Sequence, residues 1–418
     1  MHFLSFLFLI PDITAGQANG DVVLYREWVY QGLNEGVWQG IDVAWVYPIA
    51  AMVPMVVAAT FGHHLYMLGW FVLCAILNFC AVTVLLRSRT LRFGWQAAYL
   101  FILLILILGP LVFSRIDGIS APFVVMGLVV AATRPAVASL LLSLATWIKV
   151  WPAGVVMALV LSSKARLRVL IAGIGVSAIM VMAVVLGGGA RNLLGFIQAQ
   201  GDRGMQLEAP LTTPGLWQAV LRQGTYIYPN TDIDTMEIRG SLADQMSAIL
   251  NPLLMISVFG IALLIFVGVR SDANRQDLFM VGGLALVMAM IVFNKVGSPQ
   301  FMIWPAAVIC AAAAFRGREW TIPVVLMVPI CGLTTLIYPL LYPQLLASLN
   351  PGVAALLTIR NILLLIMFCW SLLKLWKMMG GAKFSSSVGI ERSAAEGHPM
   401  ARPIDSPLPL RSPAQAPD

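Results

Sequence analysis

The sequence predicts an all-α, polytopic membrane protein with about 11–12 transmembrane helices and two long outer loops. Its 418 residues are 60% hydrophobic and only 11% charged, whereas soluble domains carry about 25% charged residues. Apolar runs near the roughly 20 residues needed to cross hydrocarbon recur along the whole length. We therefore expect one transmembrane domain at residues 1–379, followed by a disordered cytoplasmic tail at 380–418 that is rich in Ser, Pro and Ala.

Two apolar stretches near the start of the chain are too short for full crossings. Met1–Ile10 has half the length of a span, and we interpret it as the remnant of a first membrane helix. Pro48–Phe61 ends at Gly62-His63-His64 and is expected to lie in the membrane interface. Adjacent histidines lack the i, i+3 or i+4 spacing of metal ligands on a helix, so no metal site is expected there.

The further crossings are predicted from the apolar runs that follow, and several of these runs are shorter than a full span. They are Leu65–Leu86, Trp95–Phe113, Ile119–Thr133, Pro135–Ile148, Pro152–Leu161, Val169–Leu186, Ile249–Val269, Leu278–Phe293, Phe301–Phe315, Ile322–Leu341 and Val353–Leu373. The stretch from Pro135 to Leu161 is also consistent with one hairpin of half-length helices. A membrane protein tolerates such helices where the broken backbone is buried or lines a cavity.

The positions of Lys and Arg predict the orientation. With the amino terminus inside, most basic residues near helix ends face the cytoplasm, and the other side receives only isolated ones. The cytoplasmic group comprises Arg87, Arg89, Arg92, Arg134, Lys164, Arg166, Arg168, Arg270, Arg275, Arg316, Arg318, Lys374 and Lys377. The long loops at 11–47 and 187–247 then lie outside, so we expect a plasma-membrane protein whose active site is extracytoplasmic.

Charge and cysteine content exclude other classes of site. The net charge of +7 comes from basic residues scattered between apolar runs, so no nucleic-acid partner is expected. The five cysteines lie in or beside apolar runs without a CxxC spacing, and we expect neither a disulfide framework nor a zinc site. The Trp and Tyr residues near helix ends are expected to form an aromatic belt: Trp28, Trp45, Tyr47, Trp151 and Trp304.

Ionisable residues at membrane depth are costly, and here they gather at the predicted outer ends of helices. The cations are Arg115, Lys149, Lys295 and Arg360. Taken singly, each could extend to the interface and anchor its helix. Anchoring, however, gives no reason for the polar neighbours Asp117, Asn294, Ser298, Gln300 and Asn361. A cationic cavity rimmed by hydrogen-bonding groups suits a lipid phosphate.

Carboxylates in the two outer loops are the candidates for acid–base chemistry. Asp21 follows the short first helix, where a general base could meet a hydroxyl acceptor, although it could equally be a solvated loop residue or a helix cap. Asp42 and Asp117 are weaker alternatives. In the second loop, Arg203 and Glu208 could bind substrate or pair with each other.

A series of short motifs carries a family resemblance. They are Asp21-x-x-x-Tyr25, Gly32 and Gly36, Trp45-Val46-Tyr47-Pro48, Lys149-x-x-Pro152, Arg203-Gly204-x-x-x-Glu208 and Asn294-Lys295-Val296-Gly297-Ser298-Pro299-Gln300. In this order they resemble glycosyltransferase family 87, which comprises GT-C-type enzymes of actinobacteria. One of these is the polyprenol-phosphate-mannose-dependent α-1,2-mannosyltransferase that extends phosphatidylinositol mannosides. The chain departs from the family pattern at Tyr47-Pro48-Ile49, where Tyr-Pro-Pro is usual.

The resemblance implies a GT-C-like fold and a polyprenol-phosphate sugar donor, with mannose as the inherited sugar. It implies a glycolipid or glycan acceptor, inversion at the anomeric carbon, and an aspartate base that maps onto Asp21. We expect the leaving phosphate to be bound by Arg115, Lys149, Arg203, Lys295 and Arg360. The expected substrate-binding residues are Tyr25, Asp42, Tyr47, Asp117, Glu208, Asn294, Ser298 and Gln300. No cofactor and no metal are expected.

Two other classes of membrane protein remain open from the sequence. A lipid or solute transporter, such as a flippase, also uses broken helices and buried charge, and it would favour inverted repeats and polar features on both faces. A non-catalytic scaffold would tolerate mutation of the outer charges. The extended loops are expected on one face only, which favours an enzyme.

Overall fold

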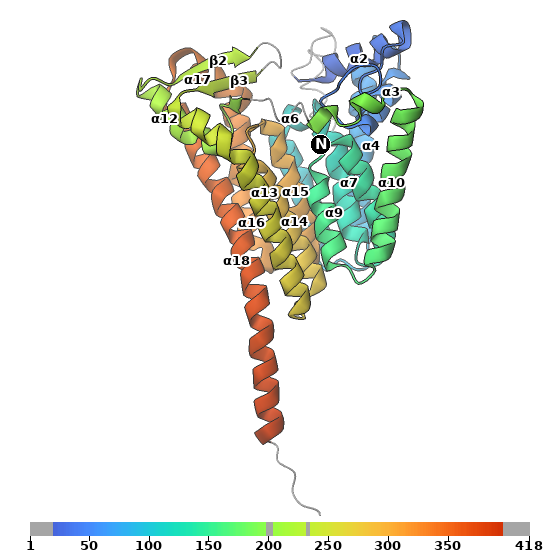
Figure 1. The fold of residues 1–418 in the computed structure, drawn as a ribbon, viewed down its shortest axis with the longest axis vertical. Helices are drawn as coiled ribbons and strands as arrows, with labels where there is room; N and C mark the ends of the chain where they lie inside the picture. Colours follow the sequence, from blue (N-terminus) through green and yellow to red (C-terminus); the bar gives the residue numbers. More distant parts are fainter. Residues whose placement is uncertain (1–19, 198–203, 231–234, 396–418) are drawn as a thin grey trace, which may run out of the picture.

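The computed structural model describes residues 20–197, 204–230 and 235–395. Helices account for 77% of the structure and strands are few, which confirms the predicted all-α, polytopic fold class. The proposed first-helix remnant, Met1–Ile10, lies outside the described residues. Figure 1 shows the helices gathered into one bundle, with short helices and a small sheet at one end. We call this end the loop face and the opposite end the basic face.

Within the described residues, six helical stretches are long and apolar enough to cross a membrane. They are α4 (Tyr66–Arg87), α10 (Arg166–Leu186), α13 (Ser241–Arg270), α14 (Arg275–Val292), the run Pro299–Ser348, and the Pro351–Met379 part of α18 (Pro351–Ala395). The last helix continues beyond residue 380, where the sequence predicts the tail to begin. In Figure 1 it extends well past the rest of the bundle at the basic face.

The run Pro299–Ser348 contains two crossings, as the sequence predicts. Its elements are η4 (Pro299–Met302), α15 (Ile303–Arg316), η5 (Gly317–Trp320), α16 (Thr321–Thr335), η6 (Leu336–Leu341) and α17 (Tyr342–Ser348). The chain reverses at Gly317, which has φ +53° and packs against the Phe93 ring. A side chain would be strained in this backbone conformation and would collide with the ring.

Shorter apolar helices complete the bundle. They are η1 with α3 (Ile49–Ala51 and Met52–Ala59), α5 (Gly94–Leu108), α7 (Asp117–Val130), α8 (Pro135–Ile148) and α9 (Pro152–Ser162). The 14 residues of α8 rise about 21 Å, which is less than the ~30 Å hydrocarbon thickness. Helices α8 and α9 thus form the expected hairpin of half-length helices. In their turn, Trp151 is buried, Lys149 is half-buried and Val150 is exposed.

The loop face holds the remaining elements. They are α2 (Val22–Glu35), α6 (Pro110–Phe113), η2 (Ala190–Asn192), η3 (Pro210–Thr212), α12 (Thr213–Val220), β1 (Met205–Gln206), β2 (Tyr226–Asn230) and β3 (Thr235–Arg239). The strands form an antiparallel sheet in the order β1-β3-β2. Part of the region expected as a plain loop, 187–247, is therefore structured. Helix α13 also begins at Ser241, earlier than the predicted Ile249.

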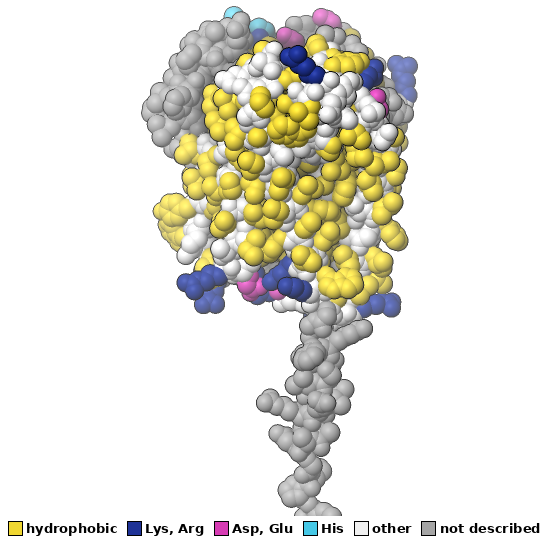
Figure 2. Space-filling view, turned by 90° about the vertical axis from the view of Figure 1, so that its left-hand side faces the viewer, with side chains coloured by type: hydrophobic (Ala, Val, Ile, Leu, Met, Phe, Trp, Pro, Cys, Tyr) yellow, Lys and Arg dark blue, Asp and Glu magenta, His cyan; other side chains and the backbone are white. Residues whose placement is uncertain are grey.

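The surface is consistent with a membrane setting. Figure 2 shows a broad apolar band, with Lys and Arg side chains along its lower edge and others at the top. At the basic face, Arg87 ends α4, Arg270 ends α13 and Arg316 ends α15. Arg316 also donates a hydrogen bond of 2.7 Å to Asp277, the acidic residue in the first turn of α14. The charged side chains on this face thus border the apolar band, as expected of a multi-pass membrane protein.

Candidate active site

Asp21 is fixed at the loop face by the close approach of two chain segments. Gly20 has φ +131°, and a Cβ atom there would collide with the Ser114 side chain. The backbone N–H of Asp21 donates to the Ser114 carbonyl at 3.1 Å. Its carboxylate forms an ion pair with Arg115, which follows α6. The residue before α2 is thereby held against the turn that joins α6 to α7.

Two tyrosines complete the surroundings of Asp21. The hydroxyls of Tyr25 and Tyr47 each donate to the Oδ2 atom of Asp21 at 3.3 Å. The Tyr25 oxygen also accepts from the backbone N–H of Ile116 at 3.0 Å. Burial and the neighbouring Tyr47 raise the pKa of Tyr25 well above its ordinary value, so its hydroxyl keeps the proton that it donates. The Asp21 carboxylate is thus held by an ion pair and by hydrogen bonds from two tyrosines.

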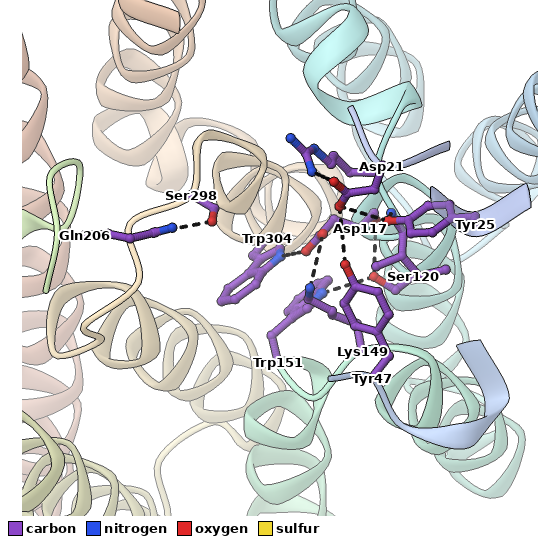
Figure 3. A network of polar contacts seen from close by, with 12 residues as sticks. Asp21, Tyr25, Tyr47, Asp117, Ser120, Lys149, Trp151, Gln206, Ser298 and Trp304 are labelled. Carbon is purple, nitrogen blue, oxygen red and sulfur yellow. Dashed lines mark hydrogen bonds and ion pairs between the residues drawn. The ribbon is translucent and has the colours of Figure 1, made fainter. Parts of the chain in front are cut away.

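A second carboxylate belongs to Asp117, which follows Arg115 by two residues. It is the first residue of α7, where the helix dipole favours negative charge. The Trp304 indole donates to its Oδ1 atom at 2.6 Å, and the Lys149 ammonium lies 3.7 Å from its Oδ2 atom. Lys149 also lies over the Tyr47 ring at 4.5 Å, and Tyr47 contacts Asp21. Figure 3 shows these side chains converging from separate helices and loops. We call Asp21, Tyr25, Tyr47, Arg115, Asp117 and Lys149 the aspartate network.

The two carboxylates differ in solvent exposure. The side chain of Asp117 is 1% exposed, whereas that of Asp21 is 23% exposed. A substrate hydroxyl can therefore approach Asp21 but not Asp117. Arg115 and Lys149 keep 21% and 17% of their side chains exposed, so both cations border the accessible space. The arrangement offers one accessible carboxylate next to two cations.

Gln206 in β1 holds the loop that precedes α15. Its backbone N–H donates to the Lys295 carbonyl at 2.9 Å, and its side-chain oxygen accepts from the Gly297 N–H at 2.9 Å. The Ser298 hydroxyl lies 3.5 Å from the same oxygen. A Cβ atom on Gly297 would collide with the backbone of Glu208, so the two segments require glycine here. The sheet is thus fastened to the loop that leads to Trp304.

The members of the predicted Asn294–Gln300 motif differ in role. The Asn294 side chain accepts from the N–H of Val296 at 2.9 Å and shapes the loop itself. Gln300 is buried in η4. Lys295 is half-buried and has no ion pair among the residues that the structure describes.

Glu208 and Arg360 form a separate buried cluster under the sheet. The Arg360 guanidinium donates to the Glu208 carbonyl at 2.5 Å and is 2% exposed as a residue. Burial raises the pKa of the Glu208 carboxyl, and the nearby Tyr342 hydroxyl and Arg360 charge partly oppose that rise. Among the described residues, no hydrogen bond or ion pair links this cluster directly to the aspartate network. Arg360 therefore fixes the backbone that packs on Gly297.

Two other predicted site residues lie apart from the aspartate network or cannot be placed. The Asp42 carboxylate accepts from the backbone N–H of Trp38 at 2.7 Å and is exposed, so it closes a local turn. Arg203 lies outside the described residues. In the described part of the chain, no three His, Cys, Asp or Glu side chains are placed together to hold a metal ion.

Sequence reasoning missed the role of two tryptophans. Trp45 is 3% exposed, so its assignment to an aromatic belt at the membrane surface is wrong. The same holds for Trp151 and Trp304, which are 1% and 4% exposed. Their rings stack 5.5 Å apart, Trp151 donates to Ser120 at 3.1 Å, and Trp304 donates to Asp117. The only available signal was the position of each tryptophan within a few residues of a predicted site motif, Lys149-x-x-Pro152 or Asn294–Gln300.

Comparison with known proteins identifies the family. The model of glycosyltransferase family 87 matches residues 45–292, which is more than half of the chain. No curated protein and no solved structure matches the chain. The matched range contains Tyr47, Arg115, Asp117 and Lys149 of the aspartate network, whereas Asp21 and Tyr25 precede it. The chain belongs to glycosyltransferase family 87, and it is a membrane glycosyltransferase.

Proposed function

We propose that this glycosyltransferase moves a sugar, mannose by family resemblance, from a polyprenol-phosphate donor to a glycolipid or glycan acceptor. The observation that carries the proposal is the aspartate network: one accessible carboxylate, Asp21, beside two cations, Arg115 and Lys149. Transfer of a phosphate-linked sugar requires these two kinds of group, a base for the incoming hydroxyl and positive charge for the leaving phosphate.

Asp21 is the proposed base. It would accept the proton of the acceptor hydroxyl while that oxygen attacks the anomeric carbon from the face opposite the phosphate, so the configuration inverts. The hydroxyls of Tyr25 and Tyr47 donate to the Asp21 carboxylate and orient it. The ion pair with Arg115 holds the Asp21 carboxylate in place before the acceptor arrives.

Lys149, Arg115 and Lys295 are the proposed partners of the leaving phosphate, whose negative charge grows as the bond to the sugar breaks. Lys149 is held between the Asp117 carboxylate and the Tyr47 ring, so its ammonium needs little reorganisation during the reaction. Lys295 would contribute from the loop that Gln206 holds. Arg203 remains a proposed partner outside the described residues. Arg360 is better placed as a positioning residue, because it is buried against the Glu208 carbonyl.

We further propose that the protein resides in the plasma membrane with the loop face outside. The support is the concentration of Lys and Arg at the helix ends of the basic face, which the positive-inside rule assigns to the cytoplasm. The site then works on lipid-linked sugars at the outer surface, where nucleotide sugars are absent.

The donor class is tested by incubating membranes that contain the protein with radiolabelled polyprenyl-phosphate mannose, polyprenyl-phosphate arabinose or a nucleotide sugar. The proposal predicts transfer of label from a polyprenyl-phosphate donor to a lipid or glycan fraction. Transfer from the nucleotide sugar alone, in membranes depleted of polyprenol, would contradict it.

A further inference from the structure

A groove between α8, α9 and α10 opens on the membrane-facing side of the bundle. Its cavity has a volume of about 230 Å³. The lining is mainly apolar: Trp147 on α8, Ala153, Val156 and Val160 on α9, and Val169, Leu170 and Ile174 on α10. Leu170 and Ile174 are 41% and 64% exposed, so the rim formed by α10 faces the surrounding lipid.

The groove has a defined architecture, because two hydrogen bonds join α8 to α10 and the helices approach closely between them. Ser139 donates to the Val169 carbonyl at 2.7 Å, and the Trp147 indole donates to the Ser177 hydroxyl at 3.0 Å. Between these contacts, a Cβ atom on Gly173 would lie 3.1 Å from the Ser143 hydroxyl. A larger residue at Gly173 would therefore press against Ser143 and Ser139 of α8.

The groove lies beside the turn that carries Lys149. Trp147 and Ala153 line its end nearest the loop face, and they flank the turn that carries Lys149. Lys149 contacts both Asp117 and Tyr47. A chain lying in the groove would therefore present its head group to the cations of the site.

The depth of the site agrees with a substrate that stays in the bilayer. Trp147, near the end of α8, is level with Ser177 of α10 because their side chains are hydrogen-bonded. Helix α10 continues from Ser177 to Leu186, a further rise of about 13 Å toward the loop face. Lys149 is thus recessed below the end of α10, where a lipid tail reaches it without leaving hydrocarbon.

We propose that this groove binds the isoprenoid chain of the donor and aligns the sugar phosphate with Lys149 and Asp21. The inference rests on the proposed function and adds a second recognition element to it. The apolar lining contributes binding energy along the first isoprene units, and the open rim lets the rest of a long chain continue into the membrane. The enzyme therefore selects its donor partly through the lipid.

Substitutions in the groove test this proposal. Ile174→Trp fills the groove from α10 and Val156→Phe fills it from α9. The matched control is Gly175→Leu on the same helix, because a Cβ atom at Gly175 meets nothing within 4 Å. Each purified protein is assayed with sugar phosphate attached to decaprenol and to a single isoprene unit. We expect the KM for the decaprenyl donor to rise at least about tenfold in both groove variants, with the single-isoprene donor and the Gly175→Leu protein unchanged.

Each other outcome has a distinct meaning. Equal effects of Ile174→Trp and Gly175→Leu, or equal effects on the two donors, would overturn the proposed role of the groove. Activity of the wild-type protein with the lipid donors would still support the proposed function. An unchanged KM for the decaprenyl donor in Val156→Phe, with that variant folded, would assign the groove to bulk membrane lipid and also overturn the proposal. A wild-type protein that uses neither lipid donor would overturn the proposed function and the groove together.

Discussion

Replacing Asp21 with Asn is the most specific perturbation of the proposed chemistry. The amide keeps the size of the side chain and retains an oxygen that accepts hydrogen bonds from Tyr25 and Tyr47. It removes the negative charge that pairs with Arg115 and the basicity needed to take a proton from an acceptor hydroxyl. The substitution thus separates the chemical role of Asp21 from its packing.

The expected magnitudes differ strongly for activity and stability. A positioned general base contributes roughly 10²–10⁴-fold, so we expect kcat to fall by about that factor. The ion pair with Arg115 is about one-fifth exposed on each side, and pairs that water reaches contribute only about 0–1 kcal/mol. Folding should therefore be almost unaffected while transfer is nearly lost.

The assay compares label transfer per folded molecule in detergent-solubilised protein. Asp42→Asn is the control, because Asp42 is an exposed carboxylate of the same loop that accepts from the Trp38 N–H. We expect the control to stay within about twofold of wild type, given that surface substitutions away from a site are nearly neutral. An Asp21→Asn protein with normal folding and transfer within about tenfold of wild type would remove Asp21 from the mechanism, since a lost base costs more than this.

Three further substitutions test the surroundings of the site. Lys149→Ala leaves the buried Asp117 carboxylate without its cation and should cost about 3–5 kcal/mol of stability. Adding Asp117→Asn should restore most of the melting temperature but not the transfer rate. A double variant as unstable as Lys149→Ala alone would refute the pairing. Gln206→Ala deprives the buried Gly297 N–H of its acceptor. It should lower the free energy of unfolding by about 1–3 kcal/mol and also reduce the transfer rate. Gln206→Glu keeps an acceptor oxygen, so a glutamate variant no better than alanine would argue against this contact. Glu208→Gln tests the raised pKa of Glu208. A carboxyl with a higher pKa in the folded state favours folding most below its unfolded pKa and loses that contribution as pH rises through the folded value. The variant should therefore gain stability relative to wild type above pH 4.5, by up to about 1.4 kcal/mol per pH unit until the folded pKa is passed. Parallel melting curves at all pH values would contradict this.

The sequence predicted the class of the fold because that class depends on composition. Apolar runs such as Leu65–Leu86 match observed helices such as α4 (Tyr66–Arg87) within a few residues. The sheet was missed because β2 and β3 are only five residues each. Pairing between such short strands depends on the packing beneath them, which no local pattern records.

The candidate site was predicted in part, because charged residues stand out in an apolar sequence. Asp21, Arg115, Asp117 and Lys149 were identified as charges at predicted helix ends, and the structure brings these four together. Trp304 was misassigned, because a tryptophan near a helix end is equally compatible with a membrane interface and with a buried hydrogen bond. Gln206 carried no motif signal at all.

The role of Arg360 shows what charge alone leaves open. An arginine in an apolar helix indicates that a partner exists, but it does not say whether the partner is a ligand or the protein. Here the guanidinium donates to the Glu208 carbonyl, so the partner that the structure provides is backbone. Long-range contacts of this kind depend on the three-dimensional arrangement of α18 and the sheet.

Sided membrane vesicles test the central claim most directly. A polyprenyl-phosphate analogue with a single isoprene unit and a radiolabelled sugar is added to sealed vesicles that expose either the loop face or the basic face to the medium. The account predicts label transfer when the loop face is exposed, and loss of that transfer in Asp21→Asn vesicles. Transfer that occurs only when the basic face is exposed would contradict it.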